Sequence, residues 1–283
     1  MSDHPAFVAG GTAVVTGGAS GIGLAAAERF ASMGLRVCVA DINADALAEA
    51  GNRVAAKAAN GAADVMTAPI DVSDRAALNG LRDAVTDRFG DVTVLMNNAG
   101  MEPVGKALGD AERWQRILDV NLWGVIHGSQ VFAPSMIEAG KPAVIINTGS
   151  KQGITCPPGN AAYNVSKAGV KVFTEQLAHE LRSIDGCQVG AALLVPGFTF
   201  TGFTRVHVQE KPDGAWEPEQ VIDEMVAGLG RGDFYILCED NEVTRDVDNK
   251  RILWAAQDIT ENRQPLSRWH PDYAAAFADY MKT

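Results

Sequence analysis

The chain has 283 residues, of which 47% are hydrophobic and 21% are charged, and it carries a formal net charge of -11. This composition is typical of a globular protein with a substantial core, built as one large α/β domain or two small ones. The negative charge argues against general binding to a nucleic-acid backbone or an anionic membrane, but it does not exclude a small anionic cofactor held by local groups.

The first residues of the chain and the distribution of its cysteines indicate a cytoplasmic protein. Residues 1–7 contain no basic region followed by an apolar segment, so we expect no secretory signal, and no apolar run is long enough to span a membrane. No CxxC pair or histidine at metal-ligand spacing is present, and Cys38, Cys187 and Cys238 lie in apolar segments typical of buried free thiols. We therefore expect a cytoplasmic protein without a metal site.

The first forty residues predict a nucleotide-binding unit. Residues 12–15 form a predicted buried strand that leads into the glycine-rich turn 16–23 and then a helix ending near Gly34, and a second strand, 36–40, ends at Asp41. Strand, glycine turn, helix and strand in this order open a dinucleotide-binding βαβ unit, whose glycines allow backbone N–H groups to approach a pyrophosphate. Asp41 would accept hydrogen bonds from the adenosine ribose and repel a 2′-phosphate; alternatively, it is a solvated acid in a turn.

The alternation of strands and helices continues along the chain. Further strands are predicted at 65–71, 92–97, 143–147, 188–195 and 234–238, and helices at 43–59, 73–89, 110–139, 160–183, 218–229 and 242–261. Ser73 or Asp71 is expected near the N-cap of the third helix. Apolar strands alternating with helices predict an α/β Rossmann-type three-layer αβα sandwich, with a doubly wound parallel sheet of about seven strands.

We expect one domain over residues 1–283, because the sequence has no internal repeat or linker. Within it, residues 198–230 form a candidate substrate-loop region, rich at first in the apolar residues Phe198, Phe200, Phe203, Val206, Val208 and Trp216. The alternative is a surface loop packed on its own aromatic side chains. The aromatic residues of the C-terminal extension, 239–283, could cover the pocket or dock on another subunit, and the sequence does not choose.

Tyr163 and Lys167 lie four residues apart on a predicted helix, so the phenol and the ammonium project from the same face. At an effective dielectric constant near 20, a cation about 5 Å away favours the phenolate by about 3 kcal/mol and lowers the tyrosine pKa by about two units. Taken alone, the pair is also compatible with an amphipathic helix that carries a surface lysine and a half-buried tyrosine.

The pair is one of several motifs: Thr16-Gly17 with Gly21 and Gly23, Asp71, Asn97-Asn98-Ala99-Gly100, Asn121, Ser150, Tyr163 with Lys167, and Pro196-Gly197. In this order and spacing they resemble the short-chain dehydrogenase/reductase family over roughly residues 8–240. The resemblance implies that Tyr163 is the general acid/base, that Ser150 hydrogen-bonds the same substrate oxygen, and that Lys167 lowers the Tyr163 pKa and binds the nicotinamide ribose. It also implies that Asn121 holds a water in the proton path, although a buried asparagine satisfied by the backbone is the alternative.

The resemblance also places residues around the ligands. The implied cofactor-binding residues are Gly17, Ser20, Gly21, Ile22, Gly23, Asp41, Asp71, Val72, Asn98, Ala99, Gly100, Tyr163, Lys167, Pro196, Gly197, Thr199 and Thr201. The substrate-contacting candidates are Ser150, Gln152, Tyr163, Phe198 and Phe200. Thr201 is alternatively a simple loop residue, and Lys151 could reach the pocket, although an exposed lysine is the simpler interpretation.

The resemblance implies an NAD-dependent oxidoreductase acting on a secondary alcohol or its ketone. The basic residues common in NADP-preferring members are absent at Ser20 and on either side of Asp41, which favours NAD. Two alternatives stay open: a lyase or epimerase on the same scaffold, and a dinucleotide-binding sensor, which would be expected to lack the active-site Ser, Tyr or Lys. The expected partners are a small-molecule substrate and further copies of the chain in a homodimer or homotetramer, with no nucleic acid or membrane.

Overall fold

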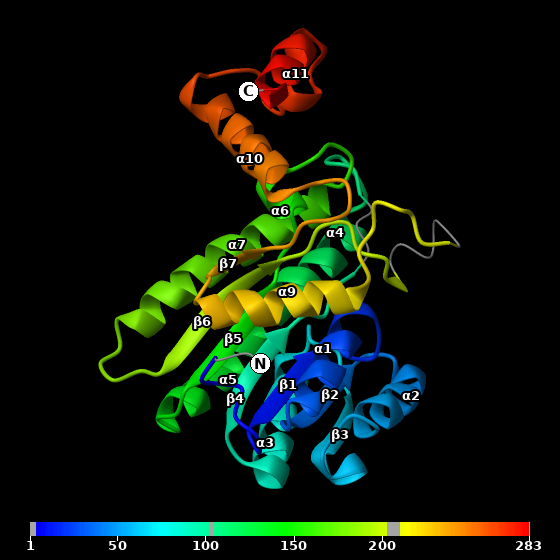
Figure 1. Ribbon diagram of the computed structural model, residues 1–283, viewed down its shortest axis with the longest axis vertical. Coiled ribbons are helices and arrows are strands. Elements are labelled where there is room, and N and C mark those ends of the chain that lie inside the picture. The colour runs from blue at the N-terminus through cyan, green and yellow to red at the C-terminus, as the bar shows by residue number, and fades with distance from the viewer. Residues whose placement is uncertain (1–3, 102–104, 203–209, 283) are drawn as a thin grey trace.

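The computed structural model describes residues 4–101, 105–202 and 210–282. Its centre is a seven-stranded sheet in the order β3-β2-β1-β4-β5-β6-β7, and every neighbouring pair is parallel (Figure 1). The strands are β1 (Thr12–Thr16), β2 (Arg36–Asp41), β3 (Val65–Pro69), β4 (Val92–Asn97), β5 (Ala143–Thr148), β6 (Val189–Val195) and β7 (Tyr235–Leu237). The predicted Rossmann-type architecture is confirmed.

Helices cover both faces of this sheet. The α-helices are α1 (Gly21–Ser32), α2 (Ala44–Ala55), α3 (Arg75–Phe89), α4 (Ala111–Leu118), α5 (Gly124–Glu138), α6 (Gln152–Thr155), α7 (Ala161–Arg182), α9 (Pro218–Arg231), α10 (Arg245–Thr260) and α11 (Ala274–Lys282). The short helices are η1 (Gly61–Asp64), the π-helical η2 (Asp119–Trp123), η3 (Ser267–Trp269) and η4 (Pro271–Tyr273). Helices α1, α2 and α9 pack on one face, and α3, α5 and α7 pack on the other.

The core follows from the pleat of the strands. Val14 and Val15 are adjacent in β1, and their fully buried side chains belong to the hydrophobic clusters on opposite faces of the sheet. Phe30 of α1 lies in one cluster and Phe132 of α5 in the other. Strands buried on both faces are therefore apolar along their whole length, which is why their sequences predicted a parallel sheet.

The strand order places the ligand-binding edge. From β1 the chain moves outward to β2 and β3 and then returns to lay β4 on the other side of β1. The turns after β1 and β4 consequently lie side by side at the carboxyl ends of the strands, where open α/β sheets bind ligands.

The structure adds two details to the predicted helices. The helix expected at 110–139 is α4 and α5 joined through the π turn η2, which contains Asn121. The third helix is capped by Asp74, whose carboxylate accepts hydrogen bonds from the N–H groups of Ala76 and Ala77, and Ser73 directly precedes this N-cap. The Asp71 carboxylate instead binds Ser73 and Arg116.

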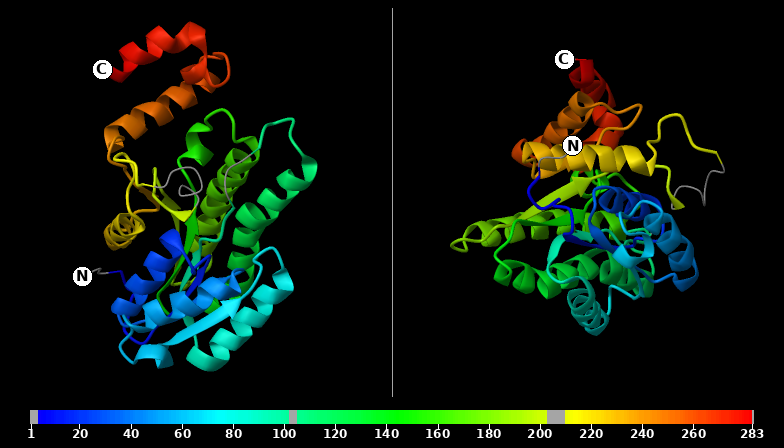
Figure 2. Two further views of the ribbon diagram at one scale, coloured as in Figure 1. Left: turned by 90° about the vertical axis from the view of Figure 1, so that its right-hand side faces the viewer. Right: turned by 60° about the horizontal axis from the view of Figure 1, so that its bottom comes forward.

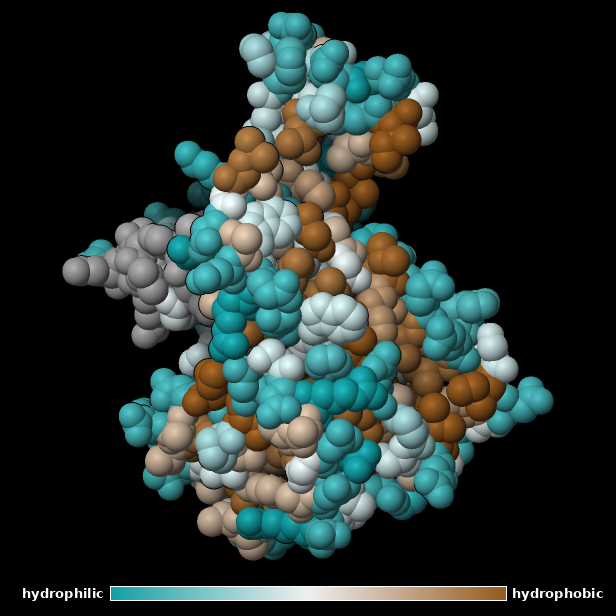
Figure 3. All heavy atoms as spheres, turned by 180° about the vertical axis from the view of Figure 1, so that it is seen from behind, coloured by the Kyte–Doolittle hydropathy of each residue, from teal (hydrophilic) through white to brown (hydrophobic). Residues whose placement is uncertain are grey.

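The C-terminal extension is a helical hairpin that projects beyond the body of the protein (Figure 2). It is centred on Trp254, whose ring lies 5.2 Å from those of Phe277 and Tyr280 and whose indole donates a 2.7 Å hydrogen bond to Ser267. On the face of the protein shown in Figure 3, apolar side chains gather where the extension meets the body. Helix α10 of the extension contacts α6 of the body. Of the described helices, none is long and apolar enough to cross a membrane.

Candidate active site

The turn between β1 and α1 requires glycine for two reasons. Gly17 and Gly21 have φ values of +63° and +51°, which L side chains rarely adopt. Gly23 is needed for close packing, since a Cβ there would lie 2.1 Å from the carbonyl oxygen of Gly17. A Cβ on Gly17 would lie 2.7 Å from Cα of Ala99, so the turn packs directly against the segment that follows β4.

The N-terminus of α1 suits an anionic group. Ser20, its N-cap, makes no side-chain capping bond, and the first turn contains no acidic residue. Its backbone N–H groups and the positive end of the helix dipole can therefore serve a diphosphate. A cavity of about 330 Å³ adjoins this end and is lined on different sides by Ser20, Gly21, Phe200 and Thr201. Thr201 lies close to Gly21, since a Cβ on that glycine would be 3.3 Å from it.

Asp41 joins the end of β2 to the glycine turn. Its Oδ2 accepts a 3.1 Å hydrogen bond from the N–H of Ala19, and its Oδ1 accepts a 2.9 Å bond from the N–H of Asn43. A carboxylate has about four lone-pair sites, so both oxygens can accept further hydrogen bonds. The position predicted for ribose recognition therefore lies beside the glycine turn.

Asn98 connects the ends of three strands. Its amide donates a 3.2 Å hydrogen bond to the carbonyl oxygen of Gly17, and its Oδ1 accepts a 3.3 Å bond from the hydroxyl of Thr148. The hydroxyl oxygen of Thr16 accepts hydrogen bonds from the N–H groups of Asn98 and Ala99 at 3.0 and 3.3 Å. These bonds fix the ends of β1, β4 and β5 relative to one another.

Asp71 and Val72 lie after β3. Burial alone would raise the pKa of Asp71, but hydrogen bonds from Ser73 and the Arg116 guanidinium hold that pKa below its ordinary value. Val72 is buried and contacts α5, since a Cβ on Gly124 would lie 2.7 Å from its side chain. Both residues are held in place by groups that lie outside the glycine turn.

Ser150, Tyr163 and Lys167 come together at the carboxyl end of β5. Ser150 lies two residues beyond that strand, and its hydroxyl hydrogen-bonds the phenol of Tyr163. The Nζ atom of Lys167 lies 5.8 Å from the centroid of the Tyr163 ring and donates a 2.7 Å hydrogen bond to the carbonyl oxygen of Thr148. The helical spacing predicted for the tyrosine and the lysine is therefore present in α7.

Burial controls the protonation of this group. It raises the pKa of Tyr163 above its ordinary value, although the hydrogen bond with Ser150 acts in the opposite direction. It lowers the pKa of Lys167 to about 8. This direction is opposite to the lowered Tyr163 pKa predicted from the sequence, because spacing reveals the attraction of the cation but not the desolvation of the two groups in the fold.

Asn121 is fully buried in the π turn between α4 and α5. Its Oδ1 accepts a 2.6 Å hydrogen bond from the N–H of Met101, and its Nδ2 lies 3.4 Å from the Met101 carbonyl oxygen and 3.5 Å from the Ser166 hydroxyl. Each polar side-chain atom therefore has a protein partner. The bonds to Met101 are those of the alternative interpretation, a buried asparagine satisfied by the backbone.

The comparisons with known proteins identify the family. The family described as short chain dehydrogenase matches residues 11–212. The chain belongs to this short-chain dehydrogenase family.

Relatives of this short-chain dehydrogenase extend over most of the chain. It is 34% identical to 1-deoxy-11-beta-hydroxypentalenate dehydrogenase of Streptomyces avermitilis, over 86% of the chain and 90% of that protein. A short-chain dehydrogenase/reductase from Burkholderia phymatum, solved with NAD, matches with a TM-score of 0.81 and 32% identity, over 91% of the chain and 96% of that structure. A metagenomic short-chain oxidoreductase solved with NADP matches with a TM-score of 0.68 and 30% identity, over 82% and 98%. The family is one of oxidoreductases that use a nicotinamide cofactor.

The substrate candidates of this short-chain dehydrogenase are separated. Gln152 follows Ser150 closely, and its N–H donates a 3.2 Å hydrogen bond to the Ser150 hydroxyl. Phe198 is 45% exposed, whereas Phe200 is buried and lines the cavity at the glycine turn. The backbones of Phe198 and Phe200 both pair with Trp216, through two hydrogen bonds of 2.8 Å. Phe203, Val206 and Val208 lie outside the described residues.

The segment after β6 lies next to the Ser150 turn. The N–H of Lys151 donates a 3.4 Å hydrogen bond to the carbonyl oxygen of Pro196, and the Thr199 hydroxyl donates a 3.3 Å bond to that of Gly197. A larger cavity, of about 590 Å³, lies between α9, β7 and the start of α10. Trp216 of the candidate substrate-loop region lines it, but none of the predicted catalytic or cofactor-binding residues does. The candidate active site therefore lies at the carboxyl ends of the strands from β1 to β6 in the sheet.

The surroundings of Lys151 were not predicted from the sequence. This lysine was expected at the surface, but its side chain is only 17% exposed and pairs with Asp240 and Asp248. No motif marked these acids, which lie roughly 90 positions further along the chain. The cysteines are all free, and burial raises the pKa of Cys38 and Cys238 to about 12, whereas Cys187 is partly exposed rather than buried.

Proposed function

We propose that this short-chain dehydrogenase interconverts a secondary alcohol and its ketone with NAD, and that Tyr163 is its general acid/base. The observation that carries the proposal is the group at the end of β5: a serine hydroxyl and a tyrosine phenol joined by a hydrogen bond, with a buried ammonium one helical turn away. Two adjacent hydroxyl groups can both bind one substrate oxygen, and one of them can exchange a proton with it.

A nicotinamide cofactor, when bound, supplies or accepts the hydride. The open N-terminus of α1 and the cavity beside Ser20 and Thr201 fit its diphosphate. The proposed cofactor-binding residues are Gly17, Ser20, Gly21, Ile22, Gly23, Asp41, Asp71, Val72, Asn98, Ala99, Gly100, Tyr163, Lys167, Pro196, Gly197, Thr199 and Thr201. We add Phe200 on the cofactor side, because it lines the same cavity.

Tyr163 is the proposed proton donor in ketone reduction. Burial raises its pKa, so the phenol is protonated at neutral pH and ready to donate. Ser150 would donate a hydrogen bond to the same oxygen and stabilise its developing negative charge. As the proton leaves, the nearby Lys167 ammonium favours the phenolate that forms. In alcohol oxidation the same groups act in reverse, with Tyr163 accepting the proton.

Asn121 is proposed to act in this proton exchange indirectly, through Lys167. Its hydrogen bonds hold η2 against Met101 and Ser166, the latter one residue before Lys167. We propose that it positions Lys167 and any water that reaches the ammonium.

The preference for NAD rests on Asp41, because relatives solved with NAD and with NADP are both similar to this chain. The Asp41 carboxylate lies at the end of β2, bonded to the glycine turn. A 2′-phosphate placed against it would meet a negative charge without a basic residue at the neighbouring positions Ala40 and Ile42.

The proposed substrate has an apolar body. Phe198 is exposed after β6, and Met101 lies against Asn121 after the turn that follows β4. The similar Streptomyces protein is by name a dehydrogenase of a hydroxylated compound, which supports an alcohol as the reacting group.

We also propose a homo-oligomer. Val165 and Val172 are seven residues apart on α7 and are 49% and 54% exposed, so they form an apolar stripe on one helix face. Trp123, at the end of η2, is 46% exposed. Exposed apolar residues grouped on adjacent helices favour burial against a second copy.

The test is nicotinamide reduction by the purified protein, given NAD or NADP with aliphatic, cyclic and aromatic secondary alcohols. We expect turnover with NAD at a kcat/KM at least about tenfold above that with NADP, or about 1.4 kcal/mol. NAD binding without turnover of any alcohol or ketone would favour the sensor. Product formation with no net change in the redox state of the cofactor would favour the lyase or epimerase.

A further inference from the structure

A buried ionic cluster lies directly beside the Ser150 turn. Lys151 Nζ is 2.6 Å from Oδ2 of Asp248 and 3.4 Å from Oδ2 of Asp240. The side chain of Lys151 is 17% exposed, and those of the two aspartates are 7% exposed. The three residues come from three segments: the turn after β5, the loop after β7, and α10 of the C-terminal extension.

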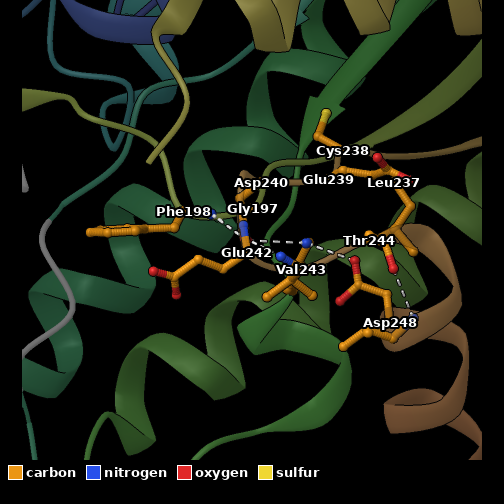
Figure 4. Close-up of polar contacts among 12 residues, drawn as sticks. Gly197, Phe198, Leu237, Cys238, Glu239, Asp240, Glu242, Val243, Thr244 and Asp248 are labelled. Carbon is orange, nitrogen blue, oxygen red and sulfur yellow. Dashed lines mark hydrogen bonds and ion pairs between the residues drawn. The ribbon is translucent and has the colours of Figure 1, made fainter. Parts of the chain in front are cut away.

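Asp240 ties this cluster to the segment after β6. Its Oδ2 accepts a 3.3 Å hydrogen bond from the N–H of Phe198, and a Cβ on Gly197 would lie 3.0 Å from both this oxygen and Lys151 Nζ. In Figure 4, Asp240 lies beside Gly197 and Phe198, while Asp248 approaches from α10. The Asp240 Oδ1 accepts a 2.8 Å bond from the N–H of Val243, which folds the loop after β7 around the carboxylate.

Asp248 ties the cluster to the extension. It lies in the first turn of α10, whose N-cap is Thr244. Further along the same helix, Ile252 packs against the hydrophobic cluster that includes Leu237, and Ile154 of α6 packs against the same cluster. The extension therefore makes two contacts here. Asp248 pairs with Lys151, and α10 packs on α6, which begins at the next residue, Gln152.

A cluster of this kind fixes geometry more than it adds stability. Removing charges from water offsets most of their attraction, so a buried ion pair contributes little net free energy, but removing one partner leaves an uncompensated charge. Here the ammonium is adjacent in sequence to Ser150, and one of the carboxylates bonds the backbone of a substrate candidate. The cluster therefore connects α10 with the Ser150 turn and with the segment after β6.

We propose that Lys151 is a positioning residue which, through Asp240 and Asp248, couples the docking of the C-terminal extension to the geometry of the Ser150 turn and the 196–199 segment. The kinetic part of this inference rests on the proposed function. The structural part, transmission from α10 to the turn, does not.

The structural test is hydrogen–deuterium exchange of the full-length Asp248→Asn protein, which keeps the side-chain shape and removes one charge. We expect faster exchange in peptides covering 149–155 and 196–202 as well as in α10. The matched control is Asp91→Asn, which breaks the exposed 2.7 Å pair with Lys141 and should leave those peptides unchanged. Faster exchange confined to residues 239–282 would overturn the proposal, whether or not the protein turns over an alcohol.

The kinetic test is a double-mutant cycle. We expect Lys151→Met and Asp248→Asn each to lower kcat at least about fivefold, the double variant to lose no more than the worse single variant, and Lys151→Arg to restore most of the activity. A structural role alone would leave kcat per folded molecule unchanged, so the melting temperature and the NAD affinity are measured in parallel. Losses that multiply independently, or a Lys151→Met kcat within twofold of the wild type, would contradict the coupling. Absence of turnover in the wild type would refute the proposed function and leave the exchange experiment to decide the inference.

Discussion

The ammonium of Lys167 donates a 2.7 Å hydrogen bond to the carbonyl oxygen of Thr148, the last residue of β5. This bond ties α7 to the strand that leads to Ser150, and it places a cation where its side chain is only 4% exposed. A single hydrogen bond does not replace the lost hydration, and the pKa of Lys167 falls accordingly to about 8.

Lys167→Met should make the protein more stable while abolishing turnover. The lysine pKa falls from 10.5 in the unfolded chain to about 8, so the buried ammonium costs roughly 3 kcal/mol at neutral pH. Methionine keeps the apolar volume but loses the hydrogen bond to Thr148, and this loss offsets about 1 kcal/mol of the gain in stability. We expect a free energy of unfolding about 1–2 kcal/mol above that of the wild type at pH 7, measured by chemical denaturation without cofactor.

The pH dependence of this difference has a defined sign. Below the folded pKa of about 8 the lysine is charged in both states and the full penalty is present. Between about 8 and 10.5 the unfolded chain binds more protons than the folded one, so wild-type stability rises with pH relative to the variant. A difference that is constant from pH 7 to pH 10, or that grows with pH, would contradict this assignment.

Asp41→Ser should shift cofactor preference towards NADP. Removing the carboxylate removes its repulsion of a 2′-phosphate, while serine can still accept a hydrogen bond from the N–H of Ala19, as Asp41 Oδ2 does. We expect the ratio of kcat/KM for NAD to that for NADP to fall at least about tenfold, or about 1.4 kcal/mol. Asp45→Ser, the same change at an exposed position in the first turn of α2, should alter the ratio less than twofold. Equal effects of the two substitutions would show that only net charge matters.

Gly23→Ala should be strongly destabilising. Its Cβ would lie 2.1 Å from the carbonyl oxygen of Gly17, a backbone atom that cannot move without displacing the turn. We expect a loss of about 2 kcal/mol or more in the free energy of unfolding, together with loss of NAD binding. Gly80→Ala is the control: it lies exposed in α3 with no atom within 4 Å of the added Cβ, and it should gain about 0.5–1 kcal/mol. A Gly23→Ala variant as stable as the wild type would mean that the turn can accommodate a Cβ at this position, contrary to the 2.1 Å approach.

The two phenylalanines after β6 should have different roles. Phe198→Ala is expected to change the ranking of alcohol substrates and leave the Kd for NAD within about threefold, because the side chain is 45% exposed and lies away from the glycine turn. Phe200→Ala is expected to weaken NAD binding, because this side chain lines the cavity beside Ser20 and Gly21. The reverse pattern, measured by NAD titration and substrate competition, would reverse the assignment.

The sequence predicted those features that depend on local patterns. Strands buried on both faces must be apolar throughout, so β1 and β4 were recognisable, and the glycine turn is constrained by backbone contacts at Gly17 and Gly23. The π turn around Asn121 was not predicted, because π turns are rare and occupy a single turn within an otherwise α-helical segment.

Features that depend on residues far apart in the sequence were not predicted. Lysine is usually a surface residue, so Lys151 was expected to be exposed. Its partners Asp240 and Asp248 are brought to it by the segment of the chain that follows β7. The direction of the Tyr163 pKa was likewise wrong, because the extent of burial is a property of the whole fold and not of the spacing between two residues.

The most direct test of the proposed mechanism compares the turnover of NAD and a secondary alcohol by Tyr163→Phe and by Tyr235→Phe. Tyr235 lies on the edge strand β7, and its phenol hydroxyl donates a hydrogen bond to Glu175 of α7. We expect Tyr163→Phe to lose at least about 100-fold in kcat, because general acid/base catalysis contributes about that much or more. The Kd for NAD should rise no more than about tenfold, because the phenol contributes at most about one hydrogen bond to the cofactor. Tyr235→Phe should retain wild-type kcat. A Tyr163→Phe protein that turns over alcohol at the rate of Tyr235→Phe would contradict the assignment of Tyr163 as the group that moves the proton.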